Sequence, residues 1–233
     1  MNRLSTGIPS LDRRLDGGLN PGSVLAIIAS PASQSEALIH ELMQERPTLY
    51  VSTLRRPAAI EDAIPADVER KQDVHVEYAG ERPSMDDEFM RQITGNRIHS
   101  VANGSSGGAS VENVYEVIGK VTDQANVVLD PTNTLERSGE ADAYREMLNR
   151  LKSTMLETNG LGVLHAIAQD DVPALRETTL LVADVVWELE LVSMINGLEY
   201  QLVVPKNRGH TPILEEISLK IDPEVWIDDS RNI

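Results

Sequence analysis

The sequence predicts an α/β protein with a mainly parallel central sheet flanked by helices and with antiparallel strands at its C-terminal end. Short apolar runs over 24–29, 48–53 and 125–130 indicate buried strands. Segments with helical spacing of apolar residues alternate with these runs, which is the order typical of a parallel sheet. From residue 183 onward apolar and polar residues alternate along strands instead, and Asn196-Gly197 is a strong hairpin signal.

Length and composition limit the classes of protein. With 233 residues the chain can bury a sizeable core. We expect one domain over 1–233, with an entry segment over 1–22 and an antiparallel extension over 183–233. The formal net charge is −16, aromatic residues make up 3% of the chain, and arginine far outnumbers lysine. This composition is typical of salt-adapted, haloarchaeal proteins, with an ordinary acidic cytosolic protein as the alternative, and it argues against direct DNA binding.

Several kinds of site and segment are excluded by what the sequence lacks. The chain has no cysteine, so it forms neither disulfides nor thiolate metal sites. Its five histidines show no paired ligand spacing, and we expect no metal site. The N-terminus carries no signal-peptide pattern, and no apolar run approaches the roughly 20 residues of a membrane span. We therefore expect a cytoplasmic protein.

The segment 23–41 indicates a buried strand, a tight loop and a helix start, where a phosphate-binding loop G-x-x-x-x-G-K-[ST] would lie. Glycines in such a loop let backbone N–H groups surround the phosphates, and the lysine reaches the terminal ones. When Pro31 is aligned with the proline common in these loops, the lysine position holds Ser35 and the Mg²⁺-binding hydroxyl position holds Glu36. The degenerate nucleotide-binding positions are therefore Ala29, Ser30, Pro31, Ala32, Ser33, Gln34, Ser35 and Glu36.

Ser33 and Glu36 have the S-x-x-E spacing of a capping box, in which each side chain binds a backbone N–H at the helix start. This predicts a helix from about 33 to 44 whose first donors are satisfied internally. A helix N-terminus attracts anions, so a resident Glu36 carboxylate would occupy that place and repel phosphate. The alternative is that the pair is merely a good helix cap.

The pattern between 57 and 122 predicts a helix over 57–70 interrupted at Pro65, a strand over 74–78, a helix over 84–93, a strand over 97–101, a loop over 103–110 and a helix over 111–122. The Gly/Ser-rich loop raises the alternative of a second phosphate cradle. Because it lacks a lysine and a regular glycine spacing, we favour a flexible loop that ends in a helix cap at Ser110.

The strand 125–130 ends in Asp130, the Walker B pattern by which NTPases hold Mg²⁺ through an aspartate. The replaced loop leaves Asp130 no cradled phosphate, so we expect it to cap the turn 131–134. Beyond it the sequence predicts a helix over 140–158 that ends at Asn159-Gly160, a strand over 161–168, a short helix, hairpin strands over 185–195 and 198–205, and a strand around 217–221.

The entry segment carries a resemblance. Thr6-Gly7-Ile8-Pro9 with Leu11-Asp12, then Gly17-Gly18-Leu19 and Gly22-Ser23, resembles the entry to KaiC-like and RadA-like members of the RecA superfamily. Lys206-Asn207-Arg208-Gly209 resembles the Lys-x-Arg-Gly segment of KaiC-like proteins. These segments and Asp130 follow in family order along most of the chain. The resemblance implies a RecA-like P-loop NTPase fold.

The resemblance also implies which functional groups are lost and which are kept. In KaiC-like relatives the second strand ends in two glutamates that polarise the attacking water, and the matching positions hold Leu54 and Arg55. Neither side chain can act as a general base. Lys206 and Arg208 match a basic pair that contacts a neighbouring subunit's ATP phosphates. The acidic connection 169–171 is too short for the DNA-binding loop of strand-exchange relatives.

The sequence therefore predicts a degenerate, KaiC-like pseudo-ATPase, a regulatory or scaffolding subunit that acts through protein partners. These would be copies of itself or an active paralogue. We expect no catalytic residue and no cofactor. Two alternatives stay open. One is a nucleotide-binding ATPase that uses Asp130 with Arg55 or Arg56 and ATP with Mg²⁺. The other is a mediator of recombination and DNA repair related to RadA paralogues, which would bind single-stranded DNA or the recombinase.

Overall fold

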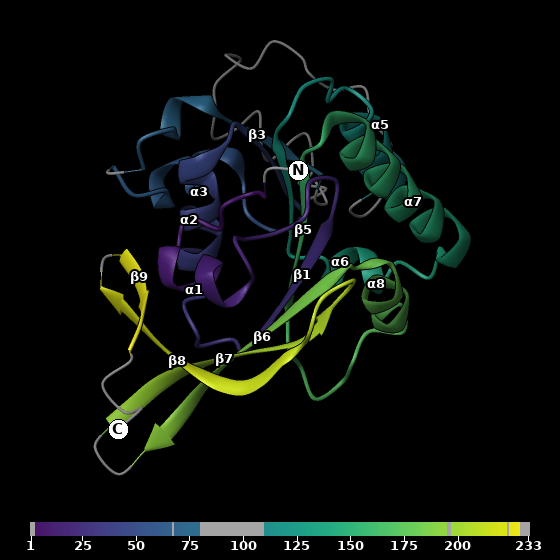
Figure 1. Cartoon of the computed structure of the whole chain (residues 1–233). Coiled ribbons are helices and arrows are strands. Elements are labelled where there is room, and N and C mark those ends of the chain that lie inside the picture. Colours follow the sequence, from purple (N-terminus) through teal and green to yellow (C-terminus); the bar gives the residue numbers. More distant parts are fainter. Residues whose placement is uncertain (1–2, 67, 80–109, 195–196, 223, 229–233) are drawn as a thin grey trace, which may run out of the picture.

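The computed structural model in Figure 1 describes residues 3–66, 68–79, 110–194, 197–222 and 224–228. Its strands within these ranges are β1 (Val24–Ala29), β2 (Thr48–Ser52), β3 (Val74–Tyr78), β4 (Asn126–Asp130), β5 (Leu161–Ile167), β6 (Val185–Met194), β7 (Gly197–Asn207), β8 (Ile213–Asp222) and β9 (Glu224–Ile227). They form one sheet in the order β3-β2-β4-β5-β1-β6-β7-β8-β9. The first six strands pair in parallel, whereas β6 to β9 pair with each other antiparallel. The predicted fold class is confirmed.

Helices cover both faces of this sheet (Figure 1). The helices are α1 (Pro9–Arg14), α2 (Glu36–Glu45), α3 (Pro57–Ala63), α5 (Val111–Ile118), α6 (Asn133–Glu136), α7 (Ala141–Thr158) and α8 (Arg176–Val182), with a 3-10 turn, η1, at Lys71–Asp73. The first three pack on one face, in a core that includes Trp187. The helices α5 to α8 pack on the other face. Successive side chains of a strand point to opposite faces, so β1 contributes to both cores.

The longest helix, α7, follows from its sequence pattern. Its apolar residues recur at helical spacing and are fully buried against the sheet: Tyr144, Met147, Leu148, Leu151 and Met155. The helix ends at Asn159, whose φ of 56° is left-handed, a conformation that asparagine tolerates at a helix end. Both the buried face and the helix end were predicted from the sequence and are confirmed.

Ser110 caps α5 as predicted, because its side chain accepts a hydrogen bond from the N–H of Asn113 at 3.3 Å. Ser110→Ala is expected to lower the free energy of unfolding by about 1 kcal/mol, since it leaves that N–H without its acceptor. Urea unfolding measures the change. Ser110→Asp, which keeps an acceptor at the cap, is the control, and equal losses in both variants would contradict the cap role.

Some predicted boundaries were wrong. Helix α2 begins at Glu36 and not near residue 33, and α5 ends at Ile118 and not at residue 122. Strand β9 was missed because it is only four residues long and alternates exposed with buried residues at the edge of the sheet. The elements predicted over 84–93 and 97–101, the loop over 103–109 and Asn196 lie outside the described residues. Within the described residues, no helix is long and apolar enough to cross a membrane.

Candidate functional site

The candidate site lies at the carboxyl ends of parallel strands. In a parallel sheet these ends share one edge, which is where open α/β sheets bind ligands. The loop 30–35 follows β1, Leu54 and Arg55 follow β2, and Asp130 is the last residue of β4. The fold therefore brings the predicted loop, the predicted general-base positions and the Walker B-like aspartate to the same edge.

Asp130 is buried and both of its carboxylate oxygens have partners. Its Oδ1 lies 2.5 Å from Nδ1 of His165, and its Oδ2 accepts a hydrogen bond from Arg55 Nη2 at 3.1 Å. The hydroxyl of Tyr50 also donates to Oδ2. The expectation that Asp130 caps the turn 131–134 is wrong, because these three donors take up the carboxylate. The carbonyl of Pro131 in that turn accepts instead from the hydroxyl of Thr53, at 2.6 Å.

These contacts decide the protonation states of Asp130 and Tyr50. Burial alone would raise the pKa of Asp130, but hydrogen bonds and charge from His165, with further bonds from Tyr50 and Arg55, lower it to about 2. Burial and the Asp130 charge raise the pKa of Tyr50 far above its ordinary value. The site therefore holds an ionised carboxylate beside a neutral phenol near neutral pH.

Ser35 and His165 extend the network beneath the loop. Ser35 Oγ lies 2.8 Å from Nε2 of His165, and both residues are almost fully buried. Nδ1 of the ring thus faces the Asp130 carboxylate, and Nε2 faces the Ser35 hydroxyl. The order Ser-His-Asp is that of a hydrolase triad. Ser35 is only 2% exposed, so its hydroxyl lies inside a buried hydrogen-bond network and does not face solvent.

Arg55 closes the network on its outer side. Its Nη2 lies 3.1 Å from Asp130 Oδ2 and 3.6 Å from Glu36 Oε1, and its side chain is 35% exposed. Its backbone N–H donates to Ser52 Oγ at 3.0 Å, which holds the start of the loop after β2. Leu54 is 64% exposed. The two positions predicted to have lost the catalytic acids thus hold a solvent-facing leucine and a cation bound to Asp130.

The hydrogen-bond donors of the loop 30–35 have partners other than the predicted ones. Ser33 donates to the carbonyl of Ser30 through both its N–H, at 3.1 Å, and its hydroxyl, at 2.7 Å. The helix starts at Glu36, and Ser35 at the N-cap makes no side-chain cap bond. The predicted capping box of Ser33 and Glu36 is therefore wrong, since the hydroxyl of Ser33 turns back into the loop. Gln34 adopts a left-handed φ of 49° within this turn.

The residues present do not fit a nucleotide with Mg²⁺ in the manner of a P-loop. The lysine position holds Ser35, whose hydroxyl is directed to His165 and not to the loop's outer surface. The carboxylate that would complete a metal shell is already bound to Arg55 and Tyr50. Glu36 at the helix start adds a negative charge where phosphate would lie. No group of three or more His, Cys, Asp or Glu residues in the described ranges could hold a metal ion.

Lys206 and Arg208 are not brought into this network. Lys206 Nζ donates to the carbonyl of Leu180 at 2.6 Å, and Arg208 Nη2 donates to that of Leu181 at 3.2 Å. Arg208 Nε also lies 3.4 Å from Asp184 Oδ1. The pair thus binds the last carbonyls of α8 within its own chain. Its predicted contact with a neighbouring subunit stays a prediction.

Sequence reasoning missed Tyr50 and His165. His165 interrupts an otherwise apolar buried strand, β5, and that polar residue in an apolar run was the available signal. Tyr50 gave no such signal, because aromatic residues are common in buried strands such as β2. Their partners became visible only in the register of the sheet, where Ser52 of β2 lies opposite Asp130 of β4.

A family model described as a family of unknown function, DUF7125, matches residues 3–233. The chain belongs to this family. No curated protein matches this DUF7125 member. Its fold is similar to that of a KaiC-like protein from the hyperthermophilic archaeon Pyrococcus horikoshii OT3, with a TM-score of 0.67, 16% identity, and 97% of this chain and 98% of that chain covered. At this identity the likeness concerns the fold, and it confirms the predicted KaiC-like, RecA-type architecture.

Proposed function

We propose that this DUF7125 member is a pseudo-ATPase: a KaiC-like domain that does not use ATP and serves as a regulatory or scaffolding subunit. The observation that carries the proposal is the network around Asp130. The positive end of Arg55 lies where a Mg²⁺ ion would need the carboxylate, and His165 holds the opposite oxygen. A metal would have to displace these donors from the carboxylate, which is costly above all for His165, because its ring is almost fully buried.

The phosphate side of the site supports the same proposal. The Glu36 carboxylate lies at the start of α2, where Arg55 Nη2 is 3.6 Å from its Oε1. The ion pair with Arg55 thus keeps a negative group at the helix start. A phosphate arriving there would meet a carboxylate and no lysine. The function left to the fold is contact with other proteins, either copies of this chain or an active paralogue.

Calorimetric titration of ATP with Mg²⁺ in concentrated KCl tests the proposal. We expect no binding by the natural protein, because it lacks both the P-loop lysine and a free carboxylate for Mg²⁺, the two groups that would hold the phosphates. The double variant Ser35→Lys/Glu36→Thr restores the lysine and the hydroxyl, and any gain in binding would locate the defect in the loop. Glu157→Thr, an exposed residue on α7, controls for the lost charge. Micromolar affinity in the natural protein would contradict the proposal.

The double variant disturbs the Ser35–His165 contact, so its folding needs its own check. Thermal melting of the double variant and of Glu36→Thr alone, which leaves Ser35 in place, separates loss of fold from failure to bind.

An unconventional ATPase predicts turnover that Asp130→Ala abolishes. A recombination mediator predicts binding of single-stranded DNA or recombinase. The acidic connection 169–171 after β5 is bound to the rest of the chain by hydrogen bonds. Arg137 donates to Asp171 Oδ2 at 2.7 Å and to the side chain of Gln169 at 3.0 Å.

A further inference from the structure

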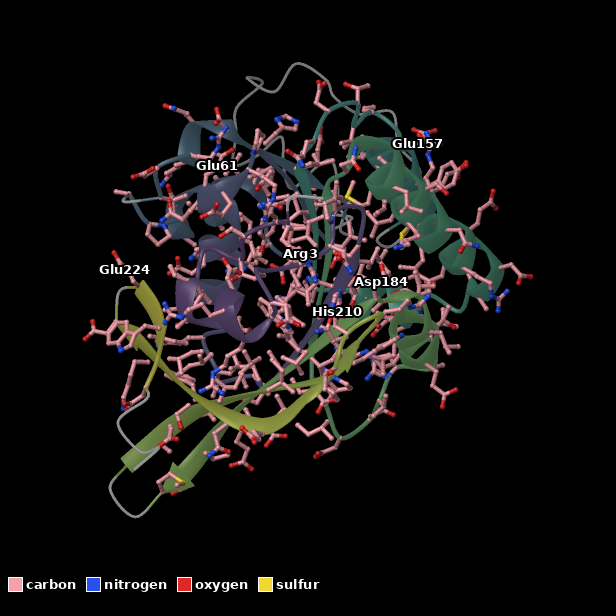
Figure 2. The ribbon with its side chains drawn as sticks, viewed as in Figure 1. Arg3, Glu61, Glu157, Asp184, His210 and Glu224 are labelled. Carbon is pink, nitrogen blue, oxygen red and sulfur yellow. The ribbon has the colours of Figure 1, made fainter. Side chains whose placement is uncertain are left out.

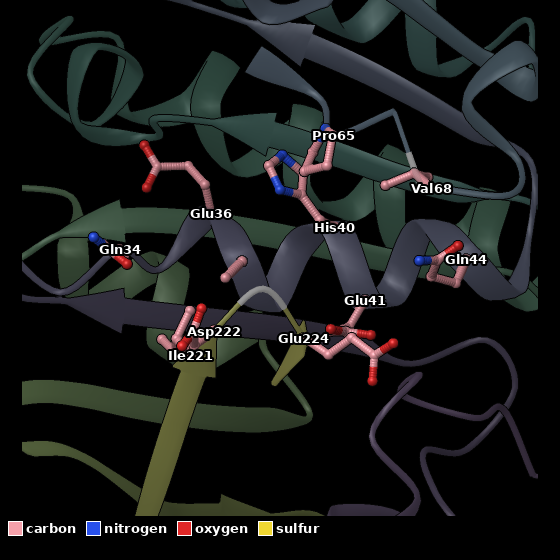
Figure 3. A pocket seen from close by; sticks show the side chains of 11 residues that line it. Gln34, Glu36, His40, Glu41, Gln44, Pro65, Val68, Ile221, Asp222 and Glu224 are labelled. Carbon is pink, nitrogen blue, oxygen red and sulfur yellow. The ribbon is translucent and has the colours of Figure 1, made fainter. Parts of the chain in front are cut away.

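A groove runs along the outer face of α2 (Figure 3). It has a volume of about 410 Å³. One side is formed by Pro65 and Val68, and the other by the end of β8 and the start of β9. Along the floor, Glu36, His40 and Gln44 follow one another at four-residue spacing on one face of the helix. The floor is therefore a straight row about 12 Å long, set between two walls.

The groove carries negative charge from three separate elements. Its four carboxylates are Glu36, Glu41, Asp222 and Glu224, and no lysine or arginine is among the described residues that line it. Figure 3 shows Glu41 and Glu224 close together and Asp222 at the end of β8. Glu41 Oε1 accepts the N–H of Val225 at 2.9 Å, which fixes the β9 wall against α2. The shape of the groove is thus held by the fold.

Two of these carboxylates are exposed and available to a ligand. The carboxylates of Asp222 and Glu224 make no ion pair or hydrogen bond with any of the residues that the structure describes, and both residues are exposed. Apolar side chains lie between the charges, with Ala37 in the floor and Pro65 and Ile221 on the two walls. A lysine or arginine side chain suits this arrangement, because its aliphatic stem covers apolar surface while its charged end reaches a carboxylate.

We propose that this groove docks a basic segment of a partner protein, with Lys or Arg side chains directed to Asp222 and Glu224. The proposal deepens the proposed function by naming the chemistry of the partner, and it rests on that function. The floor of the groove follows the axis of α2, which suits a chain segment lying along that helix. The charges of Asp222 and Glu224, on the wall formed by β8 and β9, would fix its register.

The test measures binding of a fluorescein-labelled Ala-Lys peptide of about 15 residues by anisotropy, with an Ala-Gln peptide of equal length as reference. The groove variant is Asp222→Asn/Glu224→Gln. The control variant, Glu146→Gln/Glu157→Gln, removes the same charge from exposed positions on α7. That helix lies over the opposite face of the sheet, and Figure 2 shows Glu157 far from Glu224. The full chain carries a charge of −16, so this control measures non-specific attraction.

We expect the groove variant to bind the Ala-Lys peptide about tenfold more weakly, and the control variant to change by less than about twofold. Equal weakening in both variants, or no preference over the Ala-Gln peptide, overturns the proposal. Displacement by spermine with the same dependence on Asp222 and Glu224 would assign the groove to a small polycation instead. A change in self-association of the groove variant on sedimentation would assign it to a second copy.

Failure here is separable from failure of the pseudo-ATPase proposal. Asp222 and Glu224 take no part in the network around Asp130, so the groove variant is expected to give the same ATP titration as the natural protein. Both residues are exposed, and the thermal melting of the variant is expected to match that of the natural protein.

Discussion

Arg176→Met is expected to lower the free energy of unfolding by about 3–5 kcal/mol, the usual loss when one partner of a buried ion pair is removed. Glu136 is fully buried on α6, and Arg176 Nε lies 2.9 and 2.8 Å from its two carboxylate oxygens. The hydroxyl of Thr179 donates to the same carboxylate at 2.5 Å. Methionine keeps the length and helix propensity of the side chain, so the main loss is that Glu136 stays buried without its cation.

Urea unfolding of Arg176→Met and of Arg145→Met provides the comparison. Arg145 pairs with Asp142 at 2.7 Å on the surface of α7, where Asp142 is almost fully exposed. Exposed pairs contribute little, so this control is expected to leave the unfolding midpoint nearly unchanged. The double variant Glu136→Gln/Arg176→Met should recover part of the loss, because no unpaired charge remains. Similar losses in the two single variants would show that the buried pair has no special role.

Asp130→Asn is expected to lower the free energy of unfolding by about 2–3 kcal/mol at neutral pH. The carboxylate accepts hydrogen bonds from Tyr50, Arg55 and His165. An amide has one oxygen acceptor, so donors on its nitrogen side lose their partner. The variant also removes the charge that Arg55 faces. Urea unfolding measures the loss, and Asp123→Asn, at an exposed position, is the control.

The difference between Asp130→Asn and the natural protein should depend on pH. In the folded protein the pKa of Asp130 is lowered from 3.8 to about 2. A lowered carboxyl pKa contributes stability that is present above the unfolded pKa and is lost as pH falls through the folded one. The shift corresponds to roughly 2 kcal/mol. The difference should therefore be full above about pH 5 and shrink between about pH 4 and pH 2, and a difference that is constant over this range would contradict the assigned protonation.

Much of the fold was predictable from local patterns. The buried face of α7, its end at Asn159, the cap at Ser110 and the strand leading to Asp130 each depend on residues close together in the chain. Predictions that needed the path of a loop were less successful. The hydroxyl of Ser33 had two possible partners, a helix N–H or the carbonyl of Ser30, and the sequence alone does not distinguish them.

The candidate site was predicted in its positions and not in its contacts. Ser35, Glu36, Arg55 and Asp130 were named as replaced or retained positions of a nucleotide site, and the structure places them at one edge of the sheet. The exposed groove beside α2 gave no sequence signal. Its walls come from α2, the loop at Pro65 and the β8–β9 edge, which are far apart in the chain.

The sequence by itself determined the class of fold, because strand and helix periodicities and turn residues act over a few positions. It also determined which chemical groups the degenerate loop lacks, since a missing lysine or glutamate needs no structure to be seen. The tertiary structure alone decided what replaced them. Asp130, His165, Ser35 and Arg55 meet only when β1, β2, β4 and β5 align in parallel register, and the cost of burying unpaired polar groups then selects the contacts between them.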